Sequence, residues 1–253
     1  VIQVRYFDGL GRPIQQVAHK QSNTGKDIVT HIAYDPYGRQ TKEFLPYVNT
    51  GASQNFIPAL EGTLLNFYAS PSASQTGNPF FEATTNPFSE KQLESSPLNR
   101  VLKQAAPGNA WGLPQTTGLP EDRSIKFDYQ TNGFEEVKYF KVTASWNGTK
   151  GVYELSLVQT GYYALNQLYK TITKDENWKL SDIKNNTTEE FKNKEGQVVL
   201  KRAYNDGVNH DTYYIYDQFG NLTYVIPPLA EGDASQTKLD NLGYQYKYDS
   251  RNR

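Results

Sequence analysis

A five-residue turn sequence recurs six times along the chain, and this repetition constrains the fold more than any other feature. The clearest copies are Asp35-Pro36-Tyr37-Gly38-Arg39 and Asp217-Gln218-Phe219-Gly220-Asn221, each preceded by a tyrosine. We number the copies turns 1 to 6 and their residues positions 1 to 5; the turns span residues 8–12, 35–39, 96–100, 193–197, 217–221 and 249–253. A turn that recurs between similar segments predicts an array of hairpins rather than an enzyme pocket.

Each position of the turn has a physical role. Position 1 carries a side-chain oxygen that can accept a main-chain N–H two residues later. Position 4 holds only glycine or asparagine, which best tolerate a positive φ, so we expect φ > 0 there at a hairpin end. Position 5 is a planar polar group, expected to pair with a carboxylate or to lie over a tyrosine ring. The residues assigned to these structural roles are Asp8, Gly11, Arg12, Asp35, Gly38, Arg39, Ser96, Asn99, Arg100, Asn193, Gly196, Asp217, Gly220 and Asn221.

The segments that flank the turns are rich in β-branched and aromatic residues, which is typical of strands. Several of these segments end at a proline, such as Pro107 and Pro227, and proline cannot donate to a β-ladder. The sequence therefore predicts an all-β fold of stacked antiparallel hairpins that form an extended twisted sheet, with an inserted β subdomain.

The spacing of the turns suggests three segments. Residues 1–107 form a first repeat segment, with a polar loop insertion at about 51–79 whose Leu64-Leu65 and Phe67-Tyr68 could dock on the sheet, followed by a strand at Phe80-Phe81. Residues 108–190 form an inserted β-rich segment, in which alternation over 127–140 and 142–158 predicts a strand–turn–strand and 164–173 favours a strand over a helix. Residues 191–253 form a second repeat segment that we expect to be truncated, as both ends of the chain look cut from a longer protein.

Composition excludes several classes of function. The formal net charge is -1, with acidic and basic residues interspersed, so there is no basic stripe and no nucleic-acid partner is expected. No run of apolar residues reaches the length of a transmembrane helix. Cysteine is absent, which excludes disulfides, thiol nucleophiles and zinc–thiolate sites. Methionine is absent too, and a chain without either oxidisable residue is suited to an extracellular environment.

The chain shows no catalytic constellation. It contains no His-Glu-x-x-His, Gly-x-Ser-x-Gly or phosphate-loop pattern. The aspartate at position 1 is replaced by serine or asparagine in some turns, which preserves the turn but would abolish acid–base chemistry. Asp175-Glu176-Asn177 offers oxygen ligands for Ca²⁺ but lacks the spaced ligands of a defined loop, so a solvated turn is favoured. We therefore predict no catalytic residue, no metal and no cofactor.

Three tryptophans leave a second interpretation open. Trp111, Trp146 and Trp178 lie beside glycine, asparagine and other polar residues. Exposed aromatic faces with polar neighbours suit stacking on sugars, so the alternative is a surface adhesin or carbohydrate-binding module whose partners are surface glycans. The simpler interpretation is that these rings pack into the sheet or cover the inserted segment.

The sequence resembles a known family. Tyr34-Asp35-x-x-Gly38-Arg39, with its following strand, resembles the YD repeat of Rhs-type proteins and teneurins. The segments 6–13 and 87–108 are similar to the uncharacterised N-terminal domain that precedes the repeats in many large Rhs-type surface proteins of Gram-negative bacteria. The resemblance covers most of residues 1–108 and 185–253, and the middle more loosely.

The resemblance implies a β-sheet that spirals into a hollow shell. In Rhs relatives the shell encloses a C-terminal toxin, which is released by self-cleavage, and the catalytic aspartates of that cleavage lie in a core region after the repeats. It therefore implies a non-enzymatic structural segment of a secreted or cell-surface bacterial protein, which builds or closes a β shell. The expected partners are downstream repeats and the C-terminal region of the same polypeptide.

Overall fold

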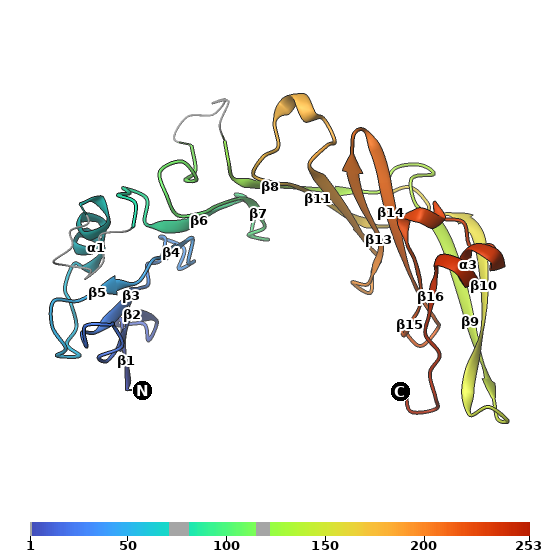
Figure 1. Ribbon diagram of the computed structural model, residues 1–253, viewed down its shortest axis with the longest axis horizontal. Coiled ribbons are helices and arrows are strands. Elements are labelled where there is room, and N and C mark those ends of the chain that lie inside the picture. The colour runs from blue at the N-terminus through green and yellow to red at the C-terminus, as the bar shows by residue number, and fades with distance from the viewer. Residues whose placement is uncertain (1, 71–80, 115–121) are drawn as a thin grey trace. The chain divides into compact units, whose positions relative to one another are not determined.

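The computed structural model describes residues 2–70, 81–114 and 122–253 (Figure 1). Antiparallel hairpins dominate these residues, which confirms the predicted all-β fold class. The chain divides into two compact units, Val1–Lys126 (unit 1) and Phe127–Arg253 (unit 2), and the boundary lies inside the segment 108–190. Across the described ranges, no helix is long and apolar enough to cross a membrane.

Unit 1 is built from two runs of neighbouring strands. One sheet has the order β1-β2-β3-β5, and a second run has the order β4-β6-β7-β8. The bounds are β1 Gln3–Phe7, β2 Pro13–Ala18, β3 Ile28–His31, β4 Lys42–Phe44, β5 Tyr47–Val48, β6 Phe88–Leu93, β7 Val101–Ala105 and β8 Ile125–Thr131. Strand β8 begins in the last two residues of unit 1 and continues into unit 2. All the pairings are antiparallel, so turns 1 and 3 each join two adjacent strands.

Residues 60–69 of unit 1 form a helix, α1 (Leu60–Ala69), where the sequence analysis expected a polar loop. Its apolar side chains recur at helical spacing, and Leu60, Leu64, Phe67 and Tyr68 are buried against Val17, Val29, Phe44 and Tyr47 of strands β2, β3, β4 and β5. The loop prediction was wrong for this stretch because it gave more weight to the flanking serines and glycines than to that periodicity. The expected docking on the sheet is confirmed for Leu64, Phe67 and Tyr68; residues 71–79 lie outside the described ranges.

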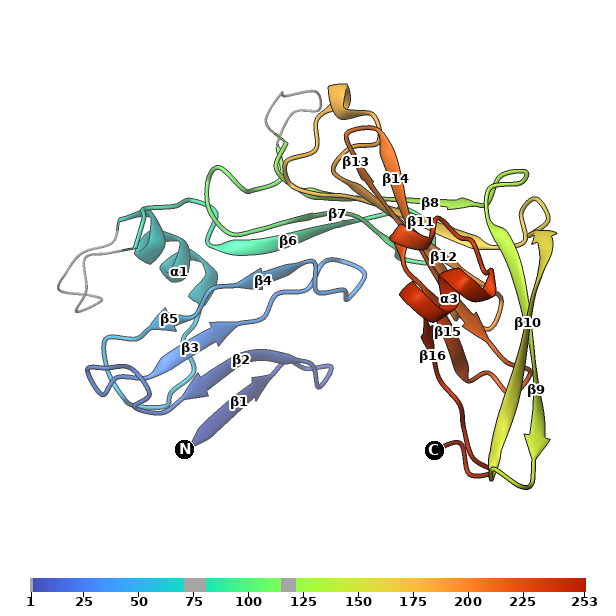
Figure 2. The same cartoon turned by 45° about the vertical axis from the view of Figure 1, so that its right-hand side comes forward.

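Unit 2 is one antiparallel sheet with a hairpin packed on it. The sheet has the order β8-β11-β12-β13-β14-β15-β16, and β9 and β10 form a separate two-stranded sheet (Figure 2). The remaining bounds are β9 Lys138–Asn147, β10 Val152–Tyr162, β11 Tyr169–Lys174, β12 Thr187–Lys192, β13 Val198–Asn205, β14 Val208–Tyr216, β15 Leu222–Ile226, β16 Tyr244–Gln245, 3-10 turns at Leu180–Asp182 and Pro228–Ala230, and α3 Gln236–Leu242. The predicted strand–turn–strand is thus β9 and β10, although residues 132–137 interrupt the strand expected over 127–140.

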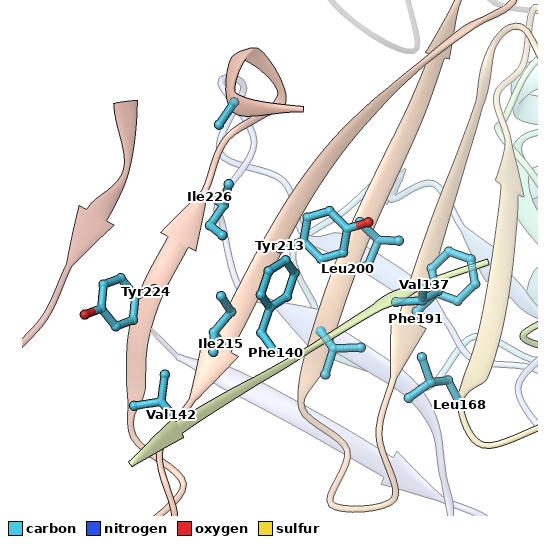
Figure 3. Packing of buried hydrophobic residues seen from close by; sticks show 12 residues of the cluster. Val137, Phe140, Val142, Leu168, Phe191, Leu200, Tyr213, Ile215, Tyr224 and Ile226 are labelled. Carbon is cyan, nitrogen blue, oxygen red and sulfur yellow. The ribbon is translucent and has the colours of Figure 1, made fainter. Parts of the chain in front are cut away.

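The core of unit 2 lies between β9 and the sheet. Phe140 of β9 packs edge-to-face on Tyr213 of β14, with 5.2 Å between the ring centroids (Figure 3). Phe191, Leu200 and Ile226 from three other strands are fully buried in the same cluster. Because strands alternate their side chains between two faces, this one buried face fixes the register of the sheet.

Several local predictions can be compared directly. β7 ends at Ala105 and β15 at Ile226, just before the prolines expected to stop pairing. Phe81 is not in a strand; it packs on the rings of Phe67 and Tyr68 of α1, while Phe80 lies outside the described residues. Within 164–173, the favoured strand begins only at residue 169 as β11.

Candidate functional site

All six turns place position 4 in the left-handed region. The φ angles are 75° at Gly11, 78° at Gly38, 52° at Asn99, 80° at Gly196, 84° at Gly220 and 57° at Asn252. In each turn the N–H of position 4 donates to the carbonyl of position 1 over 2.9 to 3.2 Å. The positive φ predicted from the glycine-or-asparagine pattern is confirmed.

The carboxylate at position 1 closes the turn from inside. In turn 1, Asp8 Oδ1 accepts the main-chain N–H groups of Leu10 and Arg12, both over 2.9 Å. Its Oδ2 binds the guanidinium of Arg12 at 2.8 Å. Turns 2 and 6 repeat all three contacts, and turn 5 repeats both main-chain bonds, with the Asn221 amide in place of the guanidinium. In turn 4, the side-chain oxygen of Asn193 accepts the N–H of position 5, at 2.8 Å.

Turn 3 is closed by a residue outside the five-residue pattern. The N–H of Glu94 donates to the carbonyl of Arg100, and the Glu94 carboxylate accepts from both the main chain and the guanidinium of Arg100. Ser96 retains its bond from the N–H of Leu98, at 3.2 Å. Glu94 therefore takes the role that aspartate has at position 1 elsewhere. The alignment on position 1 missed this residue, since it lies two residues upstream.

Within unit 1, position 5 of each turn reaches position 4 of the next. Arg12 Nη1 lies 3.2 Å from where a β-carbon on Gly38 would be, and its guanidinium carbon lies 4.4 Å from the centroid of the Tyr34 ring. Arg39 Nη1 donates to Asn99 Oδ1 over 2.6 Å. The absent side chain at Gly38 thus admits the guanidinium of the preceding turn, in addition to permitting a positive φ.

Unit 2 repeats the same contact with amides instead of guanidinium groups. Gln197 Nε2 of turn 4 donates to the carbonyl of Gly220 in turn 5 over 3.2 Å. Asn221 Nδ2 of turn 5 donates to Asn252 Oδ1 in turn 6 over 3.2 Å. Turns 1 to 3 and turns 4 to 6 therefore form two linked rows, one in each unit, and we call these the turn rows.

The tyrosine that precedes position 1 links neighbouring turns a second time. Its hydroxyl donates to the carbonyl of the residue that directly follows the preceding turn. The bonds are Tyr34 to Pro13 at 2.9 Å, Tyr216 to Val198 at 3.1 Å and Tyr248 to Leu222 at 2.8 Å. Turn 3 is preceded by Ser95, which has no phenol to make this bond. The two residues of the Tyr-Asp pair thus have separate roles. The aspartate stabilises its own turn, and the tyrosine forms a hydrogen bond to the residue that follows the preceding turn.

The tyrosine contact can be measured as stability. We expect Tyr216→Phe to lower the free energy of unfolding by about 1 kcal/mol, because it removes one hydrogen bond and leaves the ring in place. In a chain of this size that loss corresponds to a fall in melting temperature of about 2–4 °C. The control is Tyr169→Phe, at a side chain that is 65% exposed and whose hydroxyl has no hydrogen-bond partner among the described residues. If the two variants lose the same amount of stability, the Tyr216 hydroxyl does not stabilise the contact between turns 4 and 5.

Hydrogen bonding lowers the pKa of four of the carboxylates that close the turns. The main-chain N–H of position 5 lowers the pKa of Asp8, Asp35 and Asp249 below the usual value, and the guanidinium adds to the effect. In turn 3 the Arg100 guanidinium, helped by the Ser96 hydroxyl, lowers the pKa of Glu94 to about 2. These groups stabilise the folded state as anions.

Acid should therefore weaken the turns in a defined window. A folded-state pKa below the unfolded one contributes stability that is complete above the unfolded pKa and is lost as the pH falls through the folded pKa. For Glu94 this window runs from about 4.5 down to about 2. Urea titrations of wild type and Glu94→Gln across it should show a shallower pH dependence in the variant. The control is Glu82→Gln, at an exposed carboxylate with no bond to another described residue; a slope that is unchanged in Glu94→Gln contradicts the assignment.

A connected group of charges in unit 2 lies beside Phe191 of the core. Lys170 of β11 binds Glu136 at 2.6 Å and Glu189 of β12 at 3.1 Å. Arg202 of β13 binds both oxygens of Asp211 of β14, at 2.7 and 2.8 Å. We call these five residues the buried ion network, because the side chains of Lys170 and Glu189 are only 8% and 3% exposed.

Every carboxylate of the buried ion network contacts a cation. Burial opposes ionisation of Glu136, but the Gly133 N–H and Lys170 more than offset it, so the pKa of Glu136 is lowered. Burial also opposes ionisation of Asp211, and Arg202 lowers its pKa in the same way. Carboxylates held as paired anions are poor general acids, so the arrangement favours a structural role over acid–base chemistry.

The three tryptophans lie in different surroundings. Trp111 is 38% exposed and Arg123 lies 5.3 Å from its ring centroid. Lys174 lies 4.5 Å from the centroid of Trp178. Trp146 is 49% exposed and packs edge-to-face on Tyr153. Cations therefore lie over two of the three rings that the sugar-binding alternative would use.

The acidic sequence at residues 175–177 forms a turn. Asp175 Oδ1 accepts the N–H of Asn177 at 2.9 Å, and the carbonyl of Asp175 accepts the N–H of Trp178 at 3.2 Å. Over the described ranges, no three His, Cys, Asp or Glu side chains lie close enough together to hold a metal ion.

The family comparison concerns the first half of the chain. A model of a domain of unknown function, DUF6443, matches residues 1–131. The chain belongs to this DUF6443 family. The DUF6443 match takes in the whole of unit 1, with its turn row and α1, and ends at the last residue of β8. A search of the curated proteins finds no match.

Proposed function

We propose that the chain is a non-enzymatic structural segment of a secreted, Rhs-type bacterial surface protein. It would build or close a β shell around the distal region of its own polypeptide, such as a toxin. The observation that carries the proposal is the turn row, in which position 5 of each turn contacts position 4 of the next. A wall made of stacked hairpins needs such a repeat-to-repeat contact at its rim.

The charge pattern of the site supports a scaffold rather than a catalyst. In turns 1, 2 and 6, the aspartate carboxylate at position 1 already accepts hydrogen bonds from main-chain N–H groups and from the arginine of the same turn. The carboxylates of the buried ion network are likewise held by Lys170 and Arg202. The sugar-binding alternative has less support, because cations already lie over the rings of Trp111 and Trp178.

Protease protection of the natural polypeptide tests the proposal. In the polypeptide that carries this segment, the distal region should resist a protease that digests the same region when it is expressed alone. Gly38→Val together with Gly220→Val should remove that protection, because both positions combine a positive φ with a close side chain from the preceding turn.

The control for this experiment is Gly25→Val. Gly25 also has a positive φ, of 70°, but it lies outside the turn rows and nothing is within 4 Å of its virtual β-carbon. Loss of protection in the double variant alone supports a shell wall. Digestion of the distal region at the same rate in the wild-type polypeptide and in isolation contradicts it.

A further inference from the structure

A cavity of about 490 Å³ opens in unit 2 beside β9. Phe140, Lys141 and Val142 of β9 line one side, and Lys194 of turn 4 and Gln218 of turn 5 line another. This volume lies within the range of sites that bind small ligands or short peptide segments. The hairpin of β9 and β10 that borders it appears in Figure 2.

The amide of Gln218 occupies one position on the edge of β9. Its Oε1 accepts the N–H of Ala144 at 2.9 Å and its Nε2 donates to the carbonyl of Ala144 at 2.7 Å. A neighbouring strand would make the same pair of bonds to Ala144. Gln218 therefore acts as a one-residue substitute for a strand.

The same edge of β9 continues into the cavity without a strand. In an antiparallel strand every second residue directs its N–H and C=O to the same edge, so Phe140 and Val142 face the same way as Ala144. Further along, the main-chain N–H of Lys138 lies near the hydroxyl of Tyr213. Between Lys138 and Ala144, the main-chain groups of Phe140 and Val142 have no partner on this edge among the described residues, where β10 is the only strand paired with β9.

The charges around this edge are mostly positive. Lys141 and Lys194 are exposed and form no ion pair within the described part of the chain. Lys138 also lines the cavity, and its Nζ donates to main-chain carbonyls rather than to a carboxylate. Two acidic residues also line the cavity: Glu195, which is exposed, and Asp217, which is already held by the N–H groups of its own turn. The edge therefore complements an anionic segment.

Sugar stacking is less suited to this cavity than strand addition. Tyr139 and Tyr163 both line it, but their rings pack edge-to-face on each other with 4.8 Å between centroids. That contact covers part of the aromatic surface on which a sugar would stack. The main-chain groups of Phe140 and Val142 on the edge of β9 are not covered in this way.

We propose that this groove binds an extended, acidic peptide segment, which adds as a short strand to the free edge of β9. The main-chain groups of Phe140 and Val142 supply the ladder bonds, as in other cases of strand addition. Lys141 and Lys194 bind the carboxylates of the segment. The inference goes beyond the shell proposal and holds whether or not the chain forms a shell.

A fluorescein-labelled hexapeptide of sequence TVEVET is a suitable probe. Its fluorescence anisotropy should rise to saturation with the protein, and the charge-reversed peptide TVKVKT should bind about tenfold more weakly or not at all. The double variant Lys141→Glu, Lys194→Glu should reverse this preference. The matched control is Lys179→Glu, at an exposed lysine of unit 2 that lies outside the cavity and forms no ion pair among the described residues; it should bind TVEVET as wild type does.

Amide hydrogen exchange separates strand addition from simple charge attraction. On addition of TVEVET, the amides of Phe140 and Val142 should exchange more slowly, whereas the amide of Thr143, which faces β10, should not change. Binding of TVEVET without protection of Phe140 and Val142 would overturn the proposal, as would no binding of either peptide. Saturable binding of maltoheptaose in place of TVEVET would also overturn it, by assigning the groove to sugars.

Discussion

Truncation of Phe191 to alanine should lower the free energy of unfolding of unit 2 by about 4 kcal/mol. The ring is fully buried in the unit 2 core, and the cations of Lys170 and Arg202 lie 5.1 and 5.8 Å from its centroid. The substitution therefore leaves a cavity and also removes the aromatic face on which two buried cations rest. Urea unfolding followed by circular dichroism measures the loss.

Phe134→Ala is the matched control for this prediction. Phe134 lies in the same unit, but its side chain is 78% exposed, so the same truncation should change stability by less than about 0.5 kcal/mol. Phe191→Leu should fall between the two, since it retains most of the apolar volume. A loss of under about 1 kcal/mol in Phe191→Ala would mean that Phe191 is not part of a packed core.

Replacing Lys170 with methionine should cost about 3 kcal/mol. The methionine fills a similar volume, but it leaves the buried carboxylate of Glu189 and the partly buried carboxylate of Glu136 without their nearest cation. Arg202 Nη1 lies 3.9 Å from the Glu136 carboxylate and 3.8 Å from that of Glu189, and it compensates only in part. Thermal unfolding at neutral pH measures the loss.

A second substitution tests whether the cost comes from the unpaired charge. Adding Glu189→Gln to Lys170→Met should restore part of the lost stability, because it removes one of the two stranded carboxylates. The control is Lys179→Met, at an exposed lysine whose replacement should have little effect. The single variant Glu189→Gln is measured as well. If Glu189→Gln lowers the free energy of unfolding by the same amount in Lys170→Met as in the wild type, the two side chains are not coupled.

The turns were predictable because their chemistry is local. Asparagine or glycine at position 4 and an oxygen at position 1 specify a backbone conformation within five residues, whatever the rest of the fold does. The glutamate that closes turn 3 was not predictable in this way, since Glu94 bonds to Arg100 across a longer loop. Helix α1 was predictable from the spacing of Leu60, Leu64 and Phe67, but the surrounding glycines and serines masked it.

The contacts between turns and the buried ion network could not be read from the sequence. Alternation in β12 does place Glu189 on the same face as the buried Phe191, which is a signal of an inward-facing charge. Its partners Lys170 and Arg202 lie on other strands, and which residues face each other depends on the register of those strands. The contact between Gln197 and Gly220 depends on register in the same way.

The two ends of the hairpins differ in how much the length of their connections varies. At one end, neighbouring turns contact each other through positions 4 and 5, so any change in turn length breaks a contact. At the opposite end of unit 2, the connections range from the two residues between β13 and β14 to the stretch from Pro227 to Gly243, which includes α3. A foreign loop or small domain grafted between Asp206 and Gly207 should therefore leave the turn row intact. The fold separates an end that keeps the spacing of the hairpins from an end where new sequence can be added.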